Sequence, residues 1–440
     1  MGDRIPDTAA RCVADVLAQS PPPRPSRFAQ SIQGSTILQI AGEVREMQAR
    51  GEPVLNLTVG DFRPDQFPIP AALRDRIIEA LREGHTNYPP VAGVKELRES
   101  IRELTRDDLG LDYPLEGILV GGGARPLIYA GFMATVDPGD KVVYPVPSWN
   151  NHHYVGLSGA LGAPLPVSAD KNFHLDREDI APHLADARLL VLNSPLNPTG
   201  TCIGRSALLG VSEAVAEENE RRDRAGRRPL FLIYDQVYNT LTFEGAQHYT
   251  PVGLVPELAP TTILVDAVSK GLAGTGLRVG WAVGPPSLIS KMTSMAGHFG
   301  AWAPRAEQVA TARFLQDRDA LARHRTGMNQ ALMDRLGTIH QGLTAMREDG
   351  LPVQHIEPQG AIYLSVRFAV HGRTLAGRRI ESNEDLRAAL LQGAGCAVIP
   401  FEAFGFEGED GWVRLSVGAV SVQEIQEGLQ RVRSLLSAAS

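Results

Sequence analysis

Short apolar runs alternate with longer helical or polar stretches between about residues 115 and 285. Several runs are continuously apolar, as in Leu230-Phe231-Leu232-Ile233-Tyr234, which is typical of strands covered on both faces. With helical stretches such as 207–219 between the runs, the pattern predicts an α/β fold with a mostly parallel, seven-stranded sheet covered by helices. The expected strands are 117–121, 141–145, 165–167, 189–193, 230–235, 262–268 and 279–283.

The pattern changes towards the C-terminus. Residues 306–348 have the periodicity of one or two long helices, and 353–368 are strand-like apart from a break at 358–360. A helix at 383–393, short strands at 397–400 and 412–417 and a last helix at 422–436 complete a smaller α+β unit. We therefore expect an N-terminal arm at 1–34, a small domain made of 35–65 and 310–440, and a large domain at 66–309.

Composition narrows the class of function. The 440 residues are 43% hydrophobic, enough for a sizeable core, and the net charge of -7 argues against a general nucleic-acid binder. There is no run of about 18 apolar residues and no basic start before an apolar stretch, so we expect no membrane span and no secretory signal. Cys12, Cys202 and Cys396 are far apart, which favours a reducing, cytoplasmic location over a disulfide or zinc framework.

No metal motif stands out in the sequence. His152 and His153 are adjacent, and neighbouring side chains on a strand point to opposite faces. We therefore expect the two imidazoles to point apart and assign no metal ligand.

The candidate chemistry lies where the predicted strands end. Asn193, Asn197, Asp235, Ser269 and Lys270 follow three successive apolar runs. Ligands of open α/β sheets bind beyond the carboxyl ends of the strands. The sequence therefore predicts a ligand site at this edge of the sheet.

Two of these residues indicate a particular chemistry. Lys270 follows a buried run, where poor solvation favours the neutral amine that can form a Schiff base with an aldehyde cofactor. An exposed loop lysine is the alternative. Asp235 follows five apolar residues and needs a partner, such as the protonated pyridine nitrogen of pyridoxal phosphate. A helix N-cap or a structural ion pair would also satisfy this carboxylate.

A glycine-rich segment could hold a phosphate. Gly121-Gly122-Gly123-Ala124-Arg125-Pro126 joins a predicted strand to a predicted helix, and N–H groups at a helix start bind phosphate. Arg278 is a second candidate for the same anion. Trp149 could stack on a flat ring, with a plain core position as the alternative.

Taken in order, the motifs of the chain resemble those of the class I and II aminotransferases, which have the aspartate aminotransferase fold, fold type I of the pyridoxal-phosphate enzymes. The resemblance extends from about residue 35 to the C-terminus. The segments that carry it are Asn87-Tyr88-Pro89-Pro90-Val91-Ala92-Gly93, Val136-Asp137-Pro138-Gly139-Asp140, Pro147-Ser148-Trp149, Asn197-Pro198-Thr199-Gly200, Tyr234-Asp235-Gln236-Val237-Tyr238, Ser269-Lys270, Thr275-Gly276-Leu277-Arg278-Val279-Gly280 and Arg414-Leu415-Ser416.

The resemblance implies an enzyme whose large domain binds pyridoxal 5'-phosphate. It implies ping-pong transfer of an amino group between an L-amino acid, with aspartate or an aromatic amino acid as examples, and a 2-oxo acid such as 2-oxoglutarate. Lys270 would carry the cofactor and move the proton, Asp235 would pair with the ring nitrogen, and Tyr238 would bond the phenolic oxygen.

The resemblance also implies the contacts of cofactor and substrate. The residues implied for the cofactor are Gly123, Ala124, Arg125, Trp149, Asn197, Asp235, Tyr238, Ser269, Lys270, Arg278 and, from the other subunit of a homodimer with shared active sites, Tyr88. Those implied for the substrate are Gly60, Trp149, Asn197 and Arg414, of which Arg414 would bind the α-carboxylate.

Some positions depart from the family pattern. The segment 59–64 differs from the usual Gly-Glu-Pro-Asp-Phe, and Arg125 stands where lysine, serine or threonine is commoner. Two other functions stay open. One is a different reaction on the same fold, such as that of a β-lyase. The other is a regulator that senses the cofactor, although the roughly 30 residues before the fold are few for the DNA-binding domain that such proteins carry.

Overall fold

A computed structural model describes residues 13–18, 20–32, 34, 36–408 and 410–439. The chain divides into two compact units, Met1–Ser35 and Thr36–Ser440. In the first unit, helix α2 (Arg27–Ser31) begins where the Ser26 side chain accepts a hydrogen bond from the Ala29 N–H. Cys12 lies outside the described residues, whereas Cys202 and Cys396 are buried free thiols.

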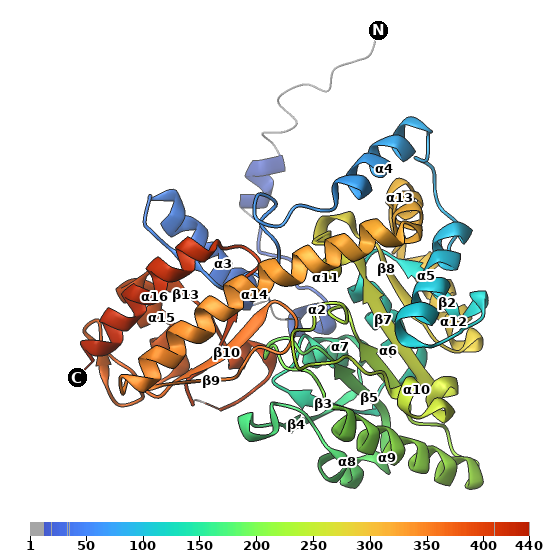
Figure 1. Ribbon diagram of the computed structural model, residues 1–440. Coiled ribbons are helices and arrows are strands. Elements are labelled where there is room, and N and C mark those ends of the chain that lie inside the picture. Colours follow the sequence, from blue (N-terminus) through green and yellow to red (C-terminus); the bar gives the residue numbers. More distant parts are fainter. Residues whose placement is uncertain (1–12, 19, 33, 35, 409, 440) are drawn as a thin grey trace. The chain divides into compact units, whose positions relative to one another are not determined.

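A seven-stranded sheet forms the centre of the second unit (Figure 1). Its strands lie in the order β2-β8-β7-β6-β5-β3-β4. Strand β8 is antiparallel to both of its neighbours, and all other pairs are parallel. The bounds are β2 (Ile118–Gly121), β3 (Lys141–Val146), β4 (Leu161–Pro166), β5 (Ala187–Asn193), β6 (Phe231–Asp235), β7 (Thr262–Ala267) and β8 (Gly280–Val283). The predicted mostly parallel sheet of seven strands is confirmed.

Helices cover both faces of this sheet because side chains alternate along each strand. In β6, Ile233 packs in the core on one face and Leu232 in the core on the other. The helices that contribute to the Ile233 side are α6 (Ala124–Thr135), α7 (Asn151–Ser158) and α12 (Pro286–Phe299). Those on the Leu232 side are α4 (Ala71–Arg82), α5 (Lys95–Leu109), α8 (Arg177–Leu184), α9 (Arg205–Arg224), α10 (Pro251–Leu254) and α13 (Arg305–Gln316).

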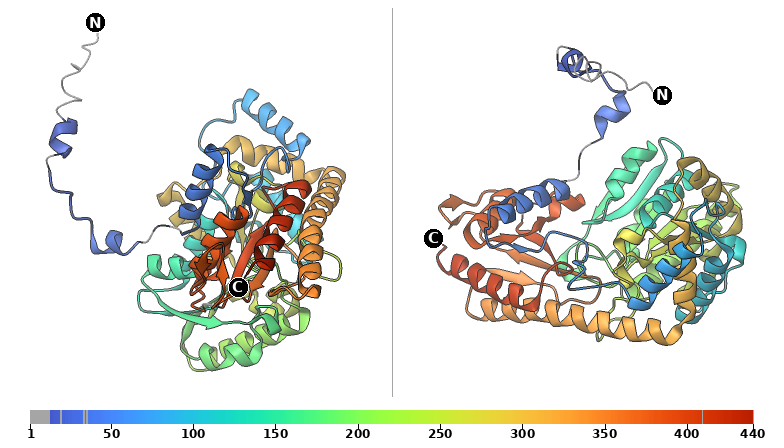
Figure 2. Two further views of the ribbon diagram at one scale, coloured as in Figure 1. Left: turned by 90° about the vertical axis from the view of Figure 1, so that its left-hand side faces the viewer. Right: turned by 90° about the horizontal axis from the view of Figure 1, so that it is seen from above.

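The helical stretch expected at 306–348 is two helices, α13 and α14 (Arg318–Glu348). They are separated at Asp317, whose side chain accepts a hydrogen bond from the Ala320 N–H and so begins α14. Figures 1 and 2 show α14 extending from α13 to the second sheet of the unit. The long helix therefore contributes to two cores, through Leu321 to the first and through Met328 and Leu332 to the second.

The C-terminal part is the expected smaller α+β unit. Its four strands are antiparallel in the order β14-β15-β10-β9, with bounds β9 (Val353–His355), β10 (Tyr363–Phe368), β14 (Ile399–Pro400) and β15 (Trp412–Ser416). The other elements of this part are β11 (Thr374–Leu375), β12 (Arg378–Arg379), α15 (Asn383–Ala394) and α16 (Val422–Ser437). The early helix α3 (Thr36–Ala49) packs against it through Val44, which lies in one cluster with Leu391 and Ala397.

An early segment joins this C-terminal part. Strand β1 (Leu55–Asn56) pairs in parallel with β13 (Cys396–Ala397), and Leu57 packs in the same core as Leu415. The segment after β1 is thereby held beside β15. The exact domain limits stated above remain a prediction, because the division into compact units separates only Met1–Ser35. None of the helices in the described residues combines the length and the apolar character of a membrane span.

Candidate active site

Three adjacent parallel strands bring the predicted polar residues to one edge of the sheet. Asn193 at the end of β5 lies in register with Asp235 at the end of β6. The Asn193 side chain donates to the Asp235 carbonyl at 2.8 Å and accepts from the Asn197 N–H at 2.9 Å. The strand end therefore fixes the loop that carries Asn197, as expected for a site beyond the carboxyl ends of parallel strands.

Lys270 lies in the single turn α11 (Val268–Gly271), which begins directly after β7. Its Nζ donates a hydrogen bond to the Gly60 carbonyl and lies 5.7 Å from the centre of the Tyr238 ring. Burial lowers the pKa of the Lys270 amine to about 8, with Asp61 opposing the shift and Arg414 assisting it. A substantial fraction of this amine is therefore neutral near physiological pH.

Asp235 is a buried carboxylate with few partners. Its Oδ1 accepts one hydrogen bond, from the Val237 N–H at 3.2 Å. Burial raises its pKa to about 6, while the Val237 N–H and the charge of Lys270 act in the opposite direction. The carboxylate can therefore accept a further hydrogen bond from a ligand.

Arg414 is fully buried among aromatic rings. Its Nη1 donates to the Asn197 side chain at 3.1 Å, and its Nη2 donates to the Thr58 carbonyl. The guanidinium carbon lies 4.7 Å from the centre of the Tyr363 ring, and Nε has no partner among the described residues. A buried N–H without an acceptor is costly unless a ligand supplies one.

Tyr363 is a site residue that the sequence analysis did not identify. Its hydroxyl is hydrogen-bonded to that of Tyr238 at 2.8 Å, and a Cβ added at Gly60 would lie 2.7 Å from the same hydroxyl oxygen. Glycine at position 60 therefore leaves the space that Tyr363 occupies. The sequence placed Tyr363 in a strand but had no motif that aimed its side chain at Lys270.

The glycine-rich segment forms a cradle at the start of α6. Gly123 is the N-cap residue with φ of 97°, a backbone conformation that favours glycine. A Cβ added there would lie 2.3 Å from Nη2 of Arg278, and one added at Gly280 would lie 2.8 Å from the Ala124 nitrogen. Arg278 donates to the Gly122 carbonyl at 2.9 Å, so its guanidinium lies beside the first N–H groups of the helix. Ser269 is buried.

Trp149 and Arg125 lie close together, whereas Tyr88 lies in a different, exposed position. The Trp149 ring lies 6.2 Å from that of Phe404 and 5.0 Å from the Arg125 guanidinium carbon. Tyr88 is 80% exposed, and its ring contacts Trp302 at 5.2 Å. In the described part of this chain, Tyr88 makes no hydrogen bond to the cradle.

The prediction that His152 and His153 point apart is wrong. They lie in the first turn of α7, which begins after Asn150 with φ of 56°, and not in a strand. Successive residues of a helix are rotated by about 100°, and the two rings lie 4.0 Å apart. Burial lowers the pKa of His152 to about 4. The described residues contain no group of three or more side chains suited to a metal ion.

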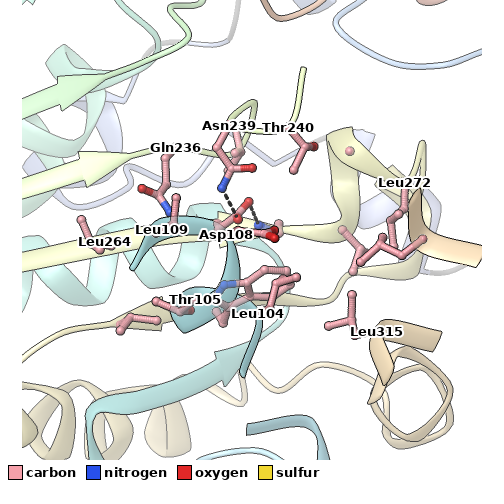
Figure 3. Close-up of a pocket in the computed structure, with 18 of the residues that line it drawn as sticks. Leu104, Thr105, Asp108, Leu109, Gln236, Asn239, Thr240, Leu264, Leu272 and Leu315 are labelled. Carbon is pink, nitrogen blue, oxygen red and sulfur yellow. Dashed lines mark hydrogen bonds between the residues drawn. The ribbon is translucent and has the colours of Figure 1, made fainter. Parts of the chain in front are cut away.

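A second buried carboxylate, also missed by the sequence analysis, lies on β7. Asp266 accepts hydrogen bonds from the Asn239 side chain at 2.7 Å and from the Ala267 N–H at 2.6 Å. It lines a cavity of about 40 Å³, roughly the room of a few ordered waters. Figure 3 shows Asn239 pointing into this cavity opposite Leu104, Thr105 and Leu109 of α5. Burial raises the pKa of Asp266 to about 7.

Comparisons with known proteins identify the family of the chain. The family Aminotransferase class I and II matches residues 52–432. The aspartate aminotransferase of Streptomyces avermitilis is 32% identical over 436 residues, which cover 96% of this chain and 99% of that protein.

Solved structures are similar as well. The aspartate aminotransferase of Rhizobium meliloti superposes with a TM-score of 0.85 at 28% identity, covering 95% of this chain and all of that one, and the aromatic aminotransferase of Pyrococcus horikoshii with 0.78 at 26% identity, covering 90% and 98%. The expected fold is thereby confirmed. The chain belongs to the class I and II aminotransferase family and is an aminotransferase.

Proposed function

We propose that this aminotransferase holds pyridoxal 5'-phosphate beside Lys270 and moves an amino group between an L-amino acid and a 2-oxo acid by a ping-pong mechanism. The observation that carries the proposal is the position of Lys270. Its partly buried amine, with a pKa lowered to about 8, lies within reach of Asp61, Asp235 and Arg414 at the carboxyl edge of the sheet.

The residues present fit this cofactor. Gly123 and Gly280 leave room for backbone N–H groups at the start of α6, and Arg278 lies over them, which suits a phosphate. Asp235 has one internal donor and can accept another from a ring nitrogen. When bound, pyridoxal phosphate supplies an aldehyde that condenses with amines and a ring that withdraws electrons from the substrate.

The chain's own groups would then bind the substrate and move its proton. Arg414 would bind the α-carboxylate, which gives its unpartnered Nε an acceptor. Lys270 would accept at Nζ the proton that leaves the substrate's α-carbon and would then pass it to the cofactor. Tyr238 and Asn197 would donate hydrogen bonds to the phenolic oxygen, and Trp149 would exclude water from one face of the ring.

An amino-donor screen tests the proposal. The purified protein is loaded with pyridoxal phosphate and mixed in turn with single L-amino acids, without an oxo acid. We expect the absorption band of the loaded enzyme to be replaced by that of the pyridoxamine form, in one turnover per site, and 2-oxoglutarate to restore it. Release of ammonia without loss of the band would contradict a transfer reaction.

We also propose a homodimer with shared sites. Tyr88, Val91 and Phe299 are exposed, and Tyr88 and Phe299 contact Trp302 and Tyr129 through their rings. Exposed apolar groups that gather in this way are typical of an interface. Tyr88 would then reach the phosphate of the neighbouring subunit.

Mixing of inactive variants tests the dimer. A hybrid of Tyr88→Ala and Lys270→Ala subunits has one site with both defects and one with neither if sites are shared, so we expect about half of the wild-type activity per hybrid. If Tyr88 acted within its own chain, mixing would restore nothing. A monomer in light scattering at micromolar concentration would contradict the dimer.

We also propose a cytoplasmic location for the enzyme, because its cysteines are widely spaced in the sequence and suit a reducing compartment.

A further inference from the structure

The turn that carries Lys270 is bonded to the long helix α14. Helix α11 has only four residues, and a helix that short cannot satisfy its own last carbonyl groups. The Gly271 carbonyl, directly after Lys270, is hydrogen-bonded to Nε2 of His324 on α14 at 3.0 Å. Because a carbonyl oxygen can only accept, this imidazole nitrogen carries a proton and donates it. The backbone beside Lys270 is therefore held by a side chain of another helix.

His324 makes this contact as a neutral, half-buried ring. Burial lowers the pKa of its imidazole, the hydrogen bond to the Gly271 carbonyl opposes the shift, and the charge of Arg325 adds to it. The ring is therefore uncharged near pH 7 and keeps one proton, which the Gly271 contact assigns to Nε2. A neutral donor holds the carbonyl without placing a charge beside Lys270.

The same helix is bonded to the segment that follows Tyr238. The side-chain amide of Asn329 donates to the Thr240 carbonyl at 3.1 Å. Thr240 also lies against α11, because a Cβ added at Gly271 would lie 2.6 Å from its hydroxyl oxygen. Helix α14 therefore makes one polar contact with each of the two segments that carry Lys270 and Tyr238, and these segments touch each other.

Helix α14 is itself firmly fixed. It packs in the first core through Leu321 and in the second through Met328. Between these positions, Arg325 pairs with Asp108 of α5 at 2.6 Å. A helix held in this way is a rigid support, and a reacting group displaced by about 1 Å can lose on the order of 10² in rate.

We propose that His324 is a positioning residue for the reaction, because it fixes the backbone beside Lys270. Asn329 acts in the same way on the segment after Tyr238. The proposal rests on the proposed function, to which it adds the groups that orient the amine. The Gly271 carbonyl, bonded to a rigid helix, limits the directions in which the lysine side chain can leave the turn. Loss of the bond should therefore slow proton transfer and leave binding of the amino donor unchanged.

The first test compares His324→Leu, which removes the donor, with His324→Gln, whose amide nitrogen can replace Nε2. In single-turnover half-reactions of the loaded enzyme, we expect His324→Leu to lower the maximal rate by roughly tenfold. The dissociation constant of the amino donor should change by less than about twofold, and His324→Gln should recover most of the rate. The matched control is His340→Leu, which removes another half-buried histidine of α14, one that bonds His355 instead, and should match the wild type.

The second test needs no activity. Hydrogen exchange of the cofactor-free protein is followed by mass spectrometry of its peptides. The N–H groups of Leu272 and Ala273, which bond to carbonyl groups of α11, should exchange faster in His324→Leu by about fivefold or more, with β7 unchanged. In Asn329→Ala, the N–H of Leu241, which bonds to the carbonyl of Tyr238, should respond in the same way.

A maximal rate of His324→Leu within about twofold of wild type would overturn the proposal, as would an equal loss of rate in His340→Leu. If His324→Leu does not fold, Asn329→Ala decides, and an unchanged rate and unchanged exchange in that variant would also overturn it. A wild-type enzyme that transfers no amino group from any donor, but shows the expected changes in exchange, would contradict the proposed function and leave the contact of His324 with α11 intact. The two failures are therefore distinguishable.

Discussion

The ends of β6 and β7 carry two buried carboxylates that face different regions. The charge of Lys270 acts on Asp235, whereas Asp266 lines the cavity that α5 also borders. Burial raises the pKa of both groups, to about 6 for Asp235 and about 7 for Asp266. Among the described residues, Asp235 accepts one hydrogen bond at its side chain, whereas Asp266 accepts one from Asn239 and another from the Ala267 N–H.

The difference bears on which of the two carboxylates would bind the proposed cofactor. By pKa alone, Asp266 would be the stronger functional candidate, because perturbed values gather at active sites. Its two oxygens are nevertheless satisfied by the protein, and its bonds tie the turn after Tyr238 to the strand before Lys270. Asp235, like Arg414 with its free Nε, retains capacity for a ligand. Unused hydrogen-bonding capacity is therefore the better guide in this fold.

The largest effect is expected for Lys270→Ala, which removes the amine proposed to carry the cofactor. Without the amine, the cofactor loses its covalent link and the proton loses its carrier, so we expect the half-reaction to slow by roughly 10³-fold or more. Borohydride reduction of the loaded wild type, followed by peptide mapping, should label Lys270. Lys95→Ala, an exposed position on α5, serves as the control. A label on another lysine would contradict the assignment.

A somewhat smaller effect is expected for Asp235→Asn, and it sharpens the comparison directly. The amide keeps the shape but cannot hold a proton on the ring nitrogen by charge. Breaking a buried charged pair costs about 3–5 kcal/mol, which corresponds to a rate loss of at least about 10². Half-reaction rates within about tenfold of wild type would show that Asp235 does not act on the ring.

Much of the fold could be predicted because local pattern and long-range packing agree. The apolar runs ending at Asn193 and Asp235 gave both the parallel strands and the edge where ligands bind. The expected strand at 165–167 is observed earlier, as β4 (Leu161–Pro166). The wrong expectation for His152 and His153 came from assigning them to a strand, whereas the left-handed Asn150 precedes a helix. Asparagine is enriched at positive φ, but such residues are uncommon, so the presence of Asn150 alone did not predict this turn.

Only those residues of the candidate site that belong to sequence motifs could be predicted. Lys270, Asp235 and Arg414 each stand in a motif, whereas Tyr363 and Asn239 reach the active-site segments from positions that no spacing links to them. Their roles depend on tertiary contacts, Tyr363 through β10 and Asn239 through the turn beside β7. The stacking of Arg125 on Trp149 likewise joins two segments that are far apart in the sequence.

Arg414→Gln tests the side chain proposed to bind the α-carboxylate of the substrate. The α-carboxylate is common to all donors, so we expect kcat/KM to fall for every amino acid by roughly 30- to 4,000-fold, which corresponds to about 2–5 kcal/mol. Because Arg414 is fully buried, thermal unfolding of the variant is measured alongside, and Arg414→Lys keeps the charge. A loss confined to acidic donors would instead assign Arg414 to the pocket for the substrate's side chain.

The smallest effect on catalysis is expected for Asp266→Asn. This variant also gives the clearest distinction between the two buried carboxylates, Asp235 and Asp266. The folded protein holds a proton on Asp266 up to a pKa of about 7, whereas the unfolded chain releases it near the ordinary value of 3.8. Between these values the folded state binds more protons, so the free energy of unfolding of the wild type falls as pH rises. Below the lower value both states are protonated, so Asp266 adds no further pH dependence and its stabilising effect is fully present. An asparagine does not titrate, so this slope should disappear.

The measurement is chemical denaturation of wild type and Asp266→Asn from pH 4 to pH 8. The amide can keep one of the two hydrogen bonds of Asp266, so we expect an offset of about 1–3 kcal/mol against the variant at low pH. The difference should then shrink or reverse as pH rises, by on the order of a few kcal/mol in all. Half-reaction rates should stay within about threefold of wild type at 25 °C, a change below about 1 kcal/mol. A difference in stability that does not vary with pH would show that Asp266 stays ionised, and a loss of rate as large as that of Asp235→Asn would remove the distinction between the two carboxylates.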